Sequence, residues 1–225
     1  TTEIYTLSLH DALPILFGST SDVVILKNGI DYKKFRYNSK ADDYYRDFFG
    51  ISKDDTVIGH VGRFDDAKNQ IYLIKIFEEM PKKYKLLLIG DGVNRSKLEK
   101  RVRDNNLNAQ IIFGGIHKNI SDIMSCFSIF AFPSKYEGLP LTLVEAQAAS
   151  LTCLISSNIT EEAIIARKLV SKLDIGLAYI EEWRTKIFNS SRNINRDAVE
   201  EMDYSFDLSQ VVMRLDEYYR GVLDE

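Results

Sequence analysis

The feature that most constrains the fold is a regular alternation between short apolar runs and longer amphipathic runs. Apolar runs at residues 56–64, 84–92, 110–115, 128–134 and 151–157 are nearly continuous rather than alternating in polarity. Continuous runs of this length are typical of strands that are buried on both faces, as in parallel sheets covered by helices. The run at 69–80 places Ile71, Ile74 and Phe77 at helical spacing. The sequence therefore predicts an α/β fold, with a five- or six-stranded parallel sheet flanked by helices.

The remaining elements are expected from the same patterns. Residues 22–31 predict a further strand that ends in an Asn-Gly turn. Helices are expected at 94–106, 120–127 and 140–150, and three more helical runs at 161–168, 177–188 and 208–223. We expect His60, inside an apolar strand, and Trp183, with Tyr179 and Phe188, to pack in the core.

The amino-acid composition argues against several classes of protein. The 225 residues are 45% hydrophobic and 28% charged, which is ordinary for a globular protein with a sizeable core. The net charge of −4 gives no basic surplus of the kind that binds nucleic acid. Cys126 and Cys153 both lie in apolar surroundings and predict no disulfide framework. No apolar run reaches the roughly 18 residues that a membrane-spanning helix needs.

The first 16 residues do not continue this pattern. The stretch YTLSLHDALPI at 5–15 resembles the translation of a sequencing adapter, so we expect residues 1–16 to lie outside the folded part. The alternative is a short natural strand or the remnant of a signal peptide. The rest divides into a ligand-binding domain over 17–207 and a last helical segment over 208–225.

Two cations follow the strand at 56–64. Arg63 and Lys68 share the loop GRFDDAK, and ligands in parallel sheets bind beyond the carboxyl ends of the strands. An arginine fork and a lysine point charge together can neutralise a diphosphate. The alternative is a surface loop in which these cations pair with Asp65 and Asp66.

Two carboxylates flank a Gly-Leu-Pro turn in YEGLPLTLVEA, residues 136–146. Pro140 suits the first turn of a helix, and the free N–H groups of a helix start favour a phosphate. Glu145 lies on an otherwise apolar helix and can accept two hydrogen bonds from a ribose diol, whereas Glu137 can reach hydroxyls of another ring. The alternative is that Glu145 only favours the helix dipole and that Glu137 is solvated.

The other candidates are weaker. Gly114 and Gly115 offer bare backbone for the close approach of a flat base. His117 is an acid/base candidate, but no nucleophile or second acid lies near it in sequence, which favours a loop histidine without a catalytic role. Asp91 suits an Asx-type turn. The sequence contains no Cys/His metal-ligand spacing, and no D-x-D pattern stands after the first 16 residues.

Taken together and in order, several segments resemble one family. They are NGID with Phe35, HVGRFDDAKN, LLLIGDG, IIFGG and FPSKYEGLPLTLVEAQAA. They resemble the C-terminal, donor-binding half of a retaining glycosyltransferase of family 4, whose GT-B fold contains two Rossmann-like domains. The resemblance covers about residues 17–223 and is strongest to bacterial capsular and exopolysaccharide transferases. The paired glutamates of that family match Glu137 and Glu145.

The resemblance implies roles for these residues. Arg63 and Lys68 would bind the donor diphosphate, Glu137 the hydroxyls of the transferred sugar, and Glu145 the ribose; Arg63, Lys68 and Glu137 would be the catalytic groups. Further donor contacts are implied for Gly62, Gly115, Ile116, Gly138, Leu139, Leu141 and Thr142. The resemblance implies no metal and no cofactor beyond a nucleotide-sugar substrate, and it favours uridine diphosphate as the nucleotide.

The resemblance also implies partners. A glycan or lipid-linked acceptor would bind through an N-terminal domain that this chain lacks, in the cytoplasm at the inner face of the membrane. We therefore expect a truncated donor-binding half, inactive alone, with the segment at 208–225 left without the domain on which it would pack. Two alternatives stay open: a sugar-nucleotide epimerase using Glu137 and His117, and a non-catalytic nucleotide-sugar-binding module.

Overall fold

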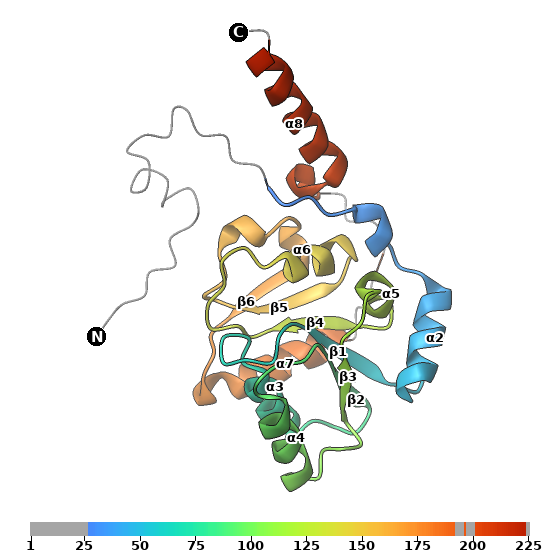
Figure 1. Ribbon diagram of the computed structural model, residues 1–225. Coiled ribbons are helices and arrows are strands. Elements are labelled where there is room, and N and C mark those ends of the chain that lie inside the picture. The colour runs from blue at the N-terminus through green and yellow to red at the C-terminus, as the bar shows by residue number, and fades with distance from the viewer. Residues whose placement is uncertain (1–26, 192–195, 197–200, 224–225) are drawn as a thin grey trace, which may run out of the picture.

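A computed structural model describes residues 27–191, 196 and 201–223 (Figure 1). The segment at 1–16 and most of the strand expected at 22–31 lie outside the described residues. At the end of that expected strand, Ile30 forms only an isolated bridge with Asp207.

Six parallel strands form one sheet in the order β3-β2-β1-β4-β5-β6. This confirms the predicted α/β fold and parallel sheet. The strands are β1 (Thr56–Val61), β2 (Tyr84–Ile89), β3 (Ile111–Gly115), β4 (Ile129–Phe132), β5 (Thr152–Ser156) and β6 (Val170–Leu173). The α-helices are α2 (Ser39–Phe49), α3 (Gln70–Phe77), α4 (Arg95–Asp104), α5 (Ile120–Met124), α6 (Leu141–Ala148), α7 (Ile180–Ser191) and α8 (Leu208–Leu223). The 3-10 helices are η1 (Tyr32–Phe35), η2 (Glu161–Ala163), η3 (Arg167–Leu169), η4 (Leu177–Tyr179) and η5 (Tyr204–Phe206).

Helices cover both faces of the sheet (Figure 1). Along β2, Leu86 and Leu88 pack in the cluster formed with α3, α4 and α7, whereas Leu87 and Ile89 pack with α2, α5 and α6. Because Leu86, Leu87, Leu88 and Ile89 are buried alternately on the two faces, this part of the strand is continuously apolar in the sequence. As expected, Trp183 is fully buried in the first cluster.

Two expectations about secondary structure and packing were wrong, and two elements were not predicted. Residues 161–168 form the short 3-10 helix η2 and the start of η3 rather than one continuous helix, because the buried Gln147 side chain accepts hydrogen bonds from the Ile165 and Ala166 N–H groups, both at 2.9 Å. Strand β6 was not predicted, since it is a short, partly exposed edge strand that contains a lysine. Helix α2 was also not predicted, although Asn38 caps its start and the left-handed Gly50 ends it. Tyr179 is 39% exposed and does not join the core.

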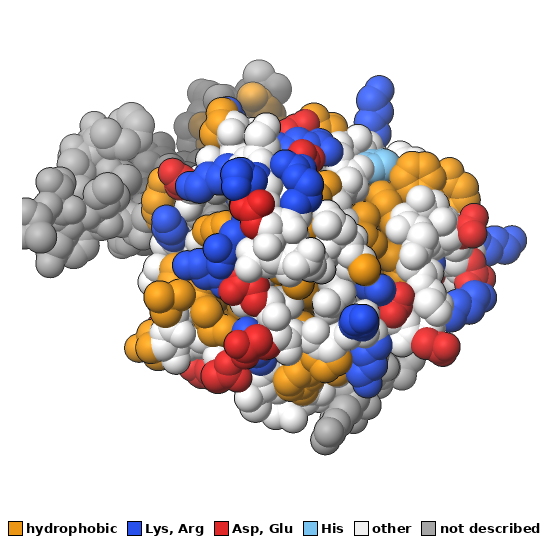
Figure 2. Space-filling view, turned by 90° about the horizontal axis from the view of Figure 1, so that it is seen from below, with side chains coloured by type: hydrophobic (Ala, Val, Ile, Leu, Met, Phe, Trp, Pro, Cys, Tyr) orange, Lys and Arg blue, Asp and Glu red, His pale blue; other side chains and the backbone are white. Residues whose placement is uncertain are grey.

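Helix α8 points away from the body of the domain (Figure 1). Its exposed apolar side chains include Leu208, Val212, Met213, Tyr218 and Tyr219. Within residues 27–191, 196 and 201–223, none of the helices combines the length and hydrophobicity needed to cross a bilayer. Acidic and basic side chains are interspersed on the face shown in Figure 2.

Both cysteines are buried in the core on the α2, α5 and α6 face. Burial raises the pKa of the Cys126 thiol to about 12 and raises that of Cys153 as well. The two thiols are therefore protonated at neutral pH and poorly reactive.

Candidate functional site

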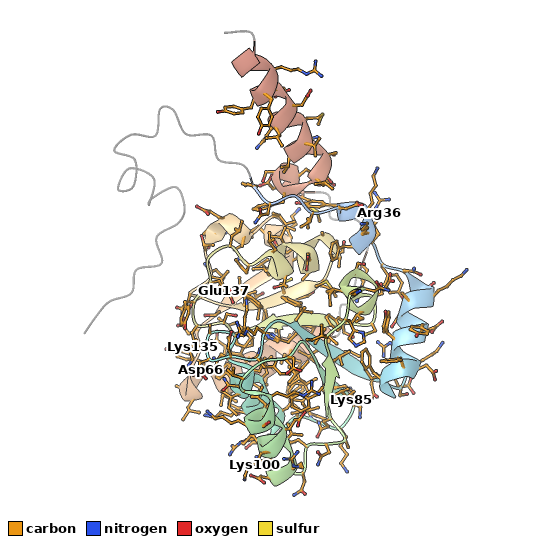
Figure 3. The ribbon with its side chains drawn as sticks, in the orientation of Figure 1. Arg36, Asp66, Lys85, Lys100, Lys135 and Glu137 are labelled. Carbon is orange, nitrogen blue, oxygen red and sulfur yellow. The ribbon has the colours of Figure 1, made fainter. Side chains whose placement is uncertain are left out.

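The strand order creates one switch point, between β1 and β4. From there the chain adds β2 and β3 on one side and β5 and β6 on the other. Loops that follow the two strands diverge at such a point and leave a crevice at the carboxyl ends. Glu137, Lys135 and Asp66 lie near one another in Figure 3, whereas Lys85 and Lys100 lie farther away.

Lys68 and Glu137 meet across this switch point. The Lys68 ammonium donates to both carboxylate oxygens of Glu137, each at 2.7 Å, and the side chains are only 19% and 12% exposed. The ammonium also lies 5.0 Å from the centre of the Phe132 ring. A Cβ added at Gly62 would lie 3.4 Å from Lys68 Cδ and Cε, so the lysine stem runs alongside this glycine. Lys68 thus pairs with Glu137 rather than with the neighbouring aspartates.

Backbone hydrogen bonds join the loops that carry the pair. The Lys135 N–H donates to the Ala67 carbonyl at 2.8 Å, and the Asn69 side chain donates to the Pro133 carbonyl at 3.1 Å. Asn69 adopts a left-handed conformation, with φ of 57°, at the cap position of α3. These bonds hold the loop after β1 against the loop after β4, which keeps the backbones that carry the two charged side chains close together.

A buried network supports the loop that carries Arg63. The His60 ring is fully buried, and its Nδ1 contacts the Ala131 carbonyl at 2.9 Å, which requires the proton on Nδ1. Nε2 then accepts from the Gln70 amide at 3.1 Å, and the same amide donates to the Arg63 carbonyl at 2.8 Å. Burial lowers the pKa of His60 to about 4, so the ring is neutral at pH 7. Sequence reasoning placed His60 correctly in the core but missed Gln70, which nothing in the local pattern distinguishes.

Arg63 itself is exposed in the loop that follows β1. Its backbone carbonyl is held by Gln70, but within the part of the chain that the structure describes its guanidinium makes no ion pair or hydrogen bond.

Nearby, Gly90 has φ of 134°, and a Cβ there would lie 2.0 Å from the Gly62 carbonyl oxygen. The ends of β1 and β2 can approach this closely only because residue 90 is glycine.

Helix α6 begins at Leu141, with Pro140 in the cap position, close to the predicted start. Among the described residues, the N–H groups of Leu141 and Thr142 find no backbone acceptor, and a Cβ at Gly138 would meet open space. The loop and the first turn therefore present free donors and room for a ligand. Free N–H groups at a helix start favour an anion.

Glu145 lies one turn further along α6 and is half-buried. Its carboxylate makes no hydrogen bond or ion pair with any described residue. Burial raises its pKa to about 7, because the charged form loses water without gaining a partner. Such a carboxylate is an unused hydrogen-bond acceptor beside the helix start.

The two glycines at the end of β3 have different surroundings. A Cβ at Gly114 would lie 2.4 Å from Ile89 Cδ1, so this glycine serves packing against β2, and its suggested contact with a base stays a prediction. Gly115 has φ of 77° and faces open space, and Ile116 is 79% exposed.

His117 Nε2 bonds to the Gly114 carbonyl at 2.8 Å, and its ring packs 6.0 Å from Phe48 of α2. Asp91 Oδ1 accepts from the Gly92 N–H, one residue on, at 2.7 Å, whereas an Asx turn would accept from the residue two positions on.

Among the predicted site residues, the structure joins Lys68 and Glu137 in an ion pair and places Gly62 against the lysine stem. The others follow β1, β3 or β4 at their carboxyl ends or lie in the first turns of α6. Cationic groups, free N–H groups and a lone carboxylate suit a ligand with both phosphates and hydroxyls. The fold and this arrangement define a Rossmann-like α/β domain with a charged site at its switch point.

The chain belongs to the glycosyl transferases group 1 family, whose sequence profile matches residues 42–172. It is 39% identical over 173 residues to the putative glycosyltransferase EpsF of Bacillus subtilis, covering 74% of this chain and 45% of that protein. It is 27% identical over 190 residues to a Campylobacter jejuni enzyme, N-acetylgalactosamine-N,N'-diacetylbacillosaminyl-diphospho-undecaprenol 4-alpha-N-acetylgalactosaminyltransferase, covering 84% of this chain and 49% of that enzyme.

The fold is also similar to that of HepE from Anabaena, whose crystal structure contains UDP and glucose. The TM-score is 0.76 at 17% identity, over 93% of this chain and 60% of HepE. This likeness confirms the expected GT-B type of domain. The chain spans about half the length of the curated relatives it matches.

Proposed function

We propose that this chain forms the donor-binding half of a retaining glycosyltransferase that moves a sugar from a uridine diphosphate donor to a glycan or lipid-linked acceptor. The observation that carries the proposal is the Lys68–Glu137 pair at the β1–β4 switch point, with the free N–H groups of α6 beside it. Family membership and the HepE complex with UDP and glucose support it.

Each residue then has a chemical task. Arg63 and Lys68 neutralise the diphosphate as it leaves, which takes over the electrostatic role of a divalent metal. Glu137 accepts hydrogen bonds from the sugar hydroxyls, and Glu145 accepts them from the ribose. The remaining contacts with the donor come from Gly62, Gly115, Ile116, Gly138, Leu139, Leu141 and Thr142. No side chain acts as a nucleophile, because the leaving diphosphate accepts the proton of the acceptor hydroxyl on the same face of the sugar.

The name of one relative supports the proposed type of acceptor. EpsF is named as a putative glycosyltransferase, and the Campylobacter enzyme is named for a diphospho-undecaprenol acceptor. We propose polysaccharide synthesis at the cytoplasmic face of the membrane, with the acceptor bound outside residues 1–225.

Calorimetry with UDP in the presence of a chelator tests the donor site. Glu145→Ala removes a charge-assisted hydrogen bond worth about 1.5 to 3 kcal/mol, so UDP affinity is expected to fall about 10- to 150-fold. His117→Ala is expected to have little effect, because its ring packs on α2 and its Nε2 bonds to the Gly114 carbonyl. An absolute need for a divalent cation, or equal losses in both variants, would contradict these roles.

The epimerase alternative is less well supported by the geometry. It requires acid/base groups beside the sugar, and His117 is engaged by the Gly114 carbonyl and by the aromatic rings of α2. Incubation with the donor alone separates the two enzymes: an epimerase changes the free nucleotide sugar without an acceptor. Binding without any product, in a chain that includes an acceptor domain, would favour the binding module.

A further inference from the structure

The two charged groups assigned to the donor occupy each other in the unliganded protein. Both oxygens of Glu137 contact the Lys68 ammonium at 2.7 Å, and both side chains are largely shielded from water. Removing the partner from a shielded charge is unfavourable, because water cannot replace the lost contact. A ligand that takes Lys68 must therefore also compensate Glu137.

A nucleotide sugar and a nucleoside diphosphate differ in whether they can compensate both Lys68 and Glu137. A nucleotide sugar brings phosphate oxygens for Lys68 and hydroxyl donors for Glu137, so both partners are replaced. A nucleoside diphosphate without a sugar replaces only the carboxylate on Lys68. It leaves Glu137 without a hydrogen-bond donor and places phosphate charge near that carboxylate.

We propose that Glu137 is a specificity-determining residue that discriminates the intact donor from its sugar-free product by competing for Lys68. Once the sugar has been transferred, Glu137 recaptures the ammonium and weakens the hold on the departing nucleotide. This inference rests on the proposed function and adds a role for the pair in product release.

The surrounding structure allows this exchange to be local. The Lys68 N–H is held by Asp65 Oδ1 at 3.0 Å, and the lysine stem is lined by Gly62. The backbone bonds from Lys135 and Asn69 keep the two loops together whichever partner the ammonium has. Only the ends of the two side chains need to move.

Calorimetry with UDP and with UDP-glucose tests the inference on the full 225-residue chain. Glu137→Gln frees Lys68 and removes the repulsion, so UDP is expected to bind about tenfold more tightly, which is about 1.4 kcal/mol. UDP-glucose is expected to gain less than about threefold, because the same change weakens the contact with the sugar. The ratio of the two affinities therefore falls.

Asp104→Asn is the matched control. It changes net charge by the same amount and removes the Lys100–Asp104 pair of 2.6 Å on α4, so UDP affinity is expected to stay unchanged. Glu137→Asp keeps the charge but withdraws the carboxylate, and a gain of about threefold is expected. This variant keeps the test available if Glu137→Gln does not fold. In a Lys68→Gln background, most of the gain in UDP affinity from Glu137→Gln should disappear, because that gain depends on the Lys68 ammonium.

The outcomes are distinct. Unchanged or weaker UDP binding in Glu137→Gln, or an equal gain for UDP and UDP-glucose, overturns the discrimination while leaving the donor site in place. Failure of the unmodified chain to bind either ligand overturns the proposed function itself.

Discussion

Replacing Glu145 by glutamine should stabilise the domain at high pH and leave its stability unchanged at low pH. Burial raises the pKa of Glu145 from 4.5 to about 7, and no described residue pairs with its carboxylate. Between these two values the folded state holds a proton that the unfolded chain has lost, so stability falls as pH rises. The contribution of protonated Glu145 is complete below pH 4.5 and is lost as pH rises through about 7.

The size of the effect follows from the pKa. A rise from 4.5 to about 7 corresponds to about 3.4 kcal/mol at 1.36 kcal/mol per pKa unit. Because the side chain is only half-buried, solvent screening reduces this to about 1 to 2 kcal/mol. In a domain of this size, 1 to 2 kcal/mol raises Tm by about 2 to 8 °C.

Thermal and urea unfolding of both proteins at pH 5 and pH 8.5 measure this effect. Protonated glutamate and glutamine are nearly isosteric, so the two proteins should agree at pH 5, and Glu145→Gln should be more stable at pH 8.5. Glu161→Gln is a control of opposite sign, because hydrogen bonds from Lys172 and Arg167 lower the pKa of Glu161. A stability difference between unmodified protein and Glu145→Gln that does not change with pH would refute the reasoning.

Two further predictions concern the support of the site. Gln70→Leu leaves the His60 Nε2 and the Arg63 carbonyl without their shared donor, so urea unfolding should show a loss of about 2 to 3 kcal/mol, and UDP affinity should fall as well. Gly90→Ala places a Cβ 2.0 Å from the Gly62 carbonyl at a φ of 134°, so a loss of about 3 kcal/mol or more is expected in the same assay. Gly138→Ala, which faces open space, should keep its stability, and equal losses in the two glycine variants would contradict the steric argument.

Strands that are buried on both faces could be predicted from sequence, because a short, continuous apolar run bounded by turn residues is typical of such a strand. Strand β6 could not, since its residues Val170, Ser171 and Lys172 are partly exposed at a sheet edge. The turns at 161–168 depend on Gln147, a side chain from another helix, and local periodicity carries no information about such a partner.

The candidate site was also predictable from the sequence only in part. The types of residue after each strand pointed to a ligand with phosphates and hydroxyls, because parallel topology brings carboxyl ends together. The pairing of Lys68 with Glu137 could not be predicted, since the two residues are 69 positions apart and either could have faced water. The packing role of Gly114 likewise depends on Ile89 and Leu87 of the neighbouring strand, which only the folded chain reveals.

The burial of both thiols has a practical consequence for spectroscopy. Cys126 and Cys153 are shielded and protonated at neutral pH, so a maleimide dye should leave them unmodified in the folded protein. A cysteine introduced at the exposed position Lys135 would then be the favoured labelling site on the native background, beside the crevice and away from the core. Fluorescence from that one position would follow ligand arrival and departure in real time, without removal of either native cysteine.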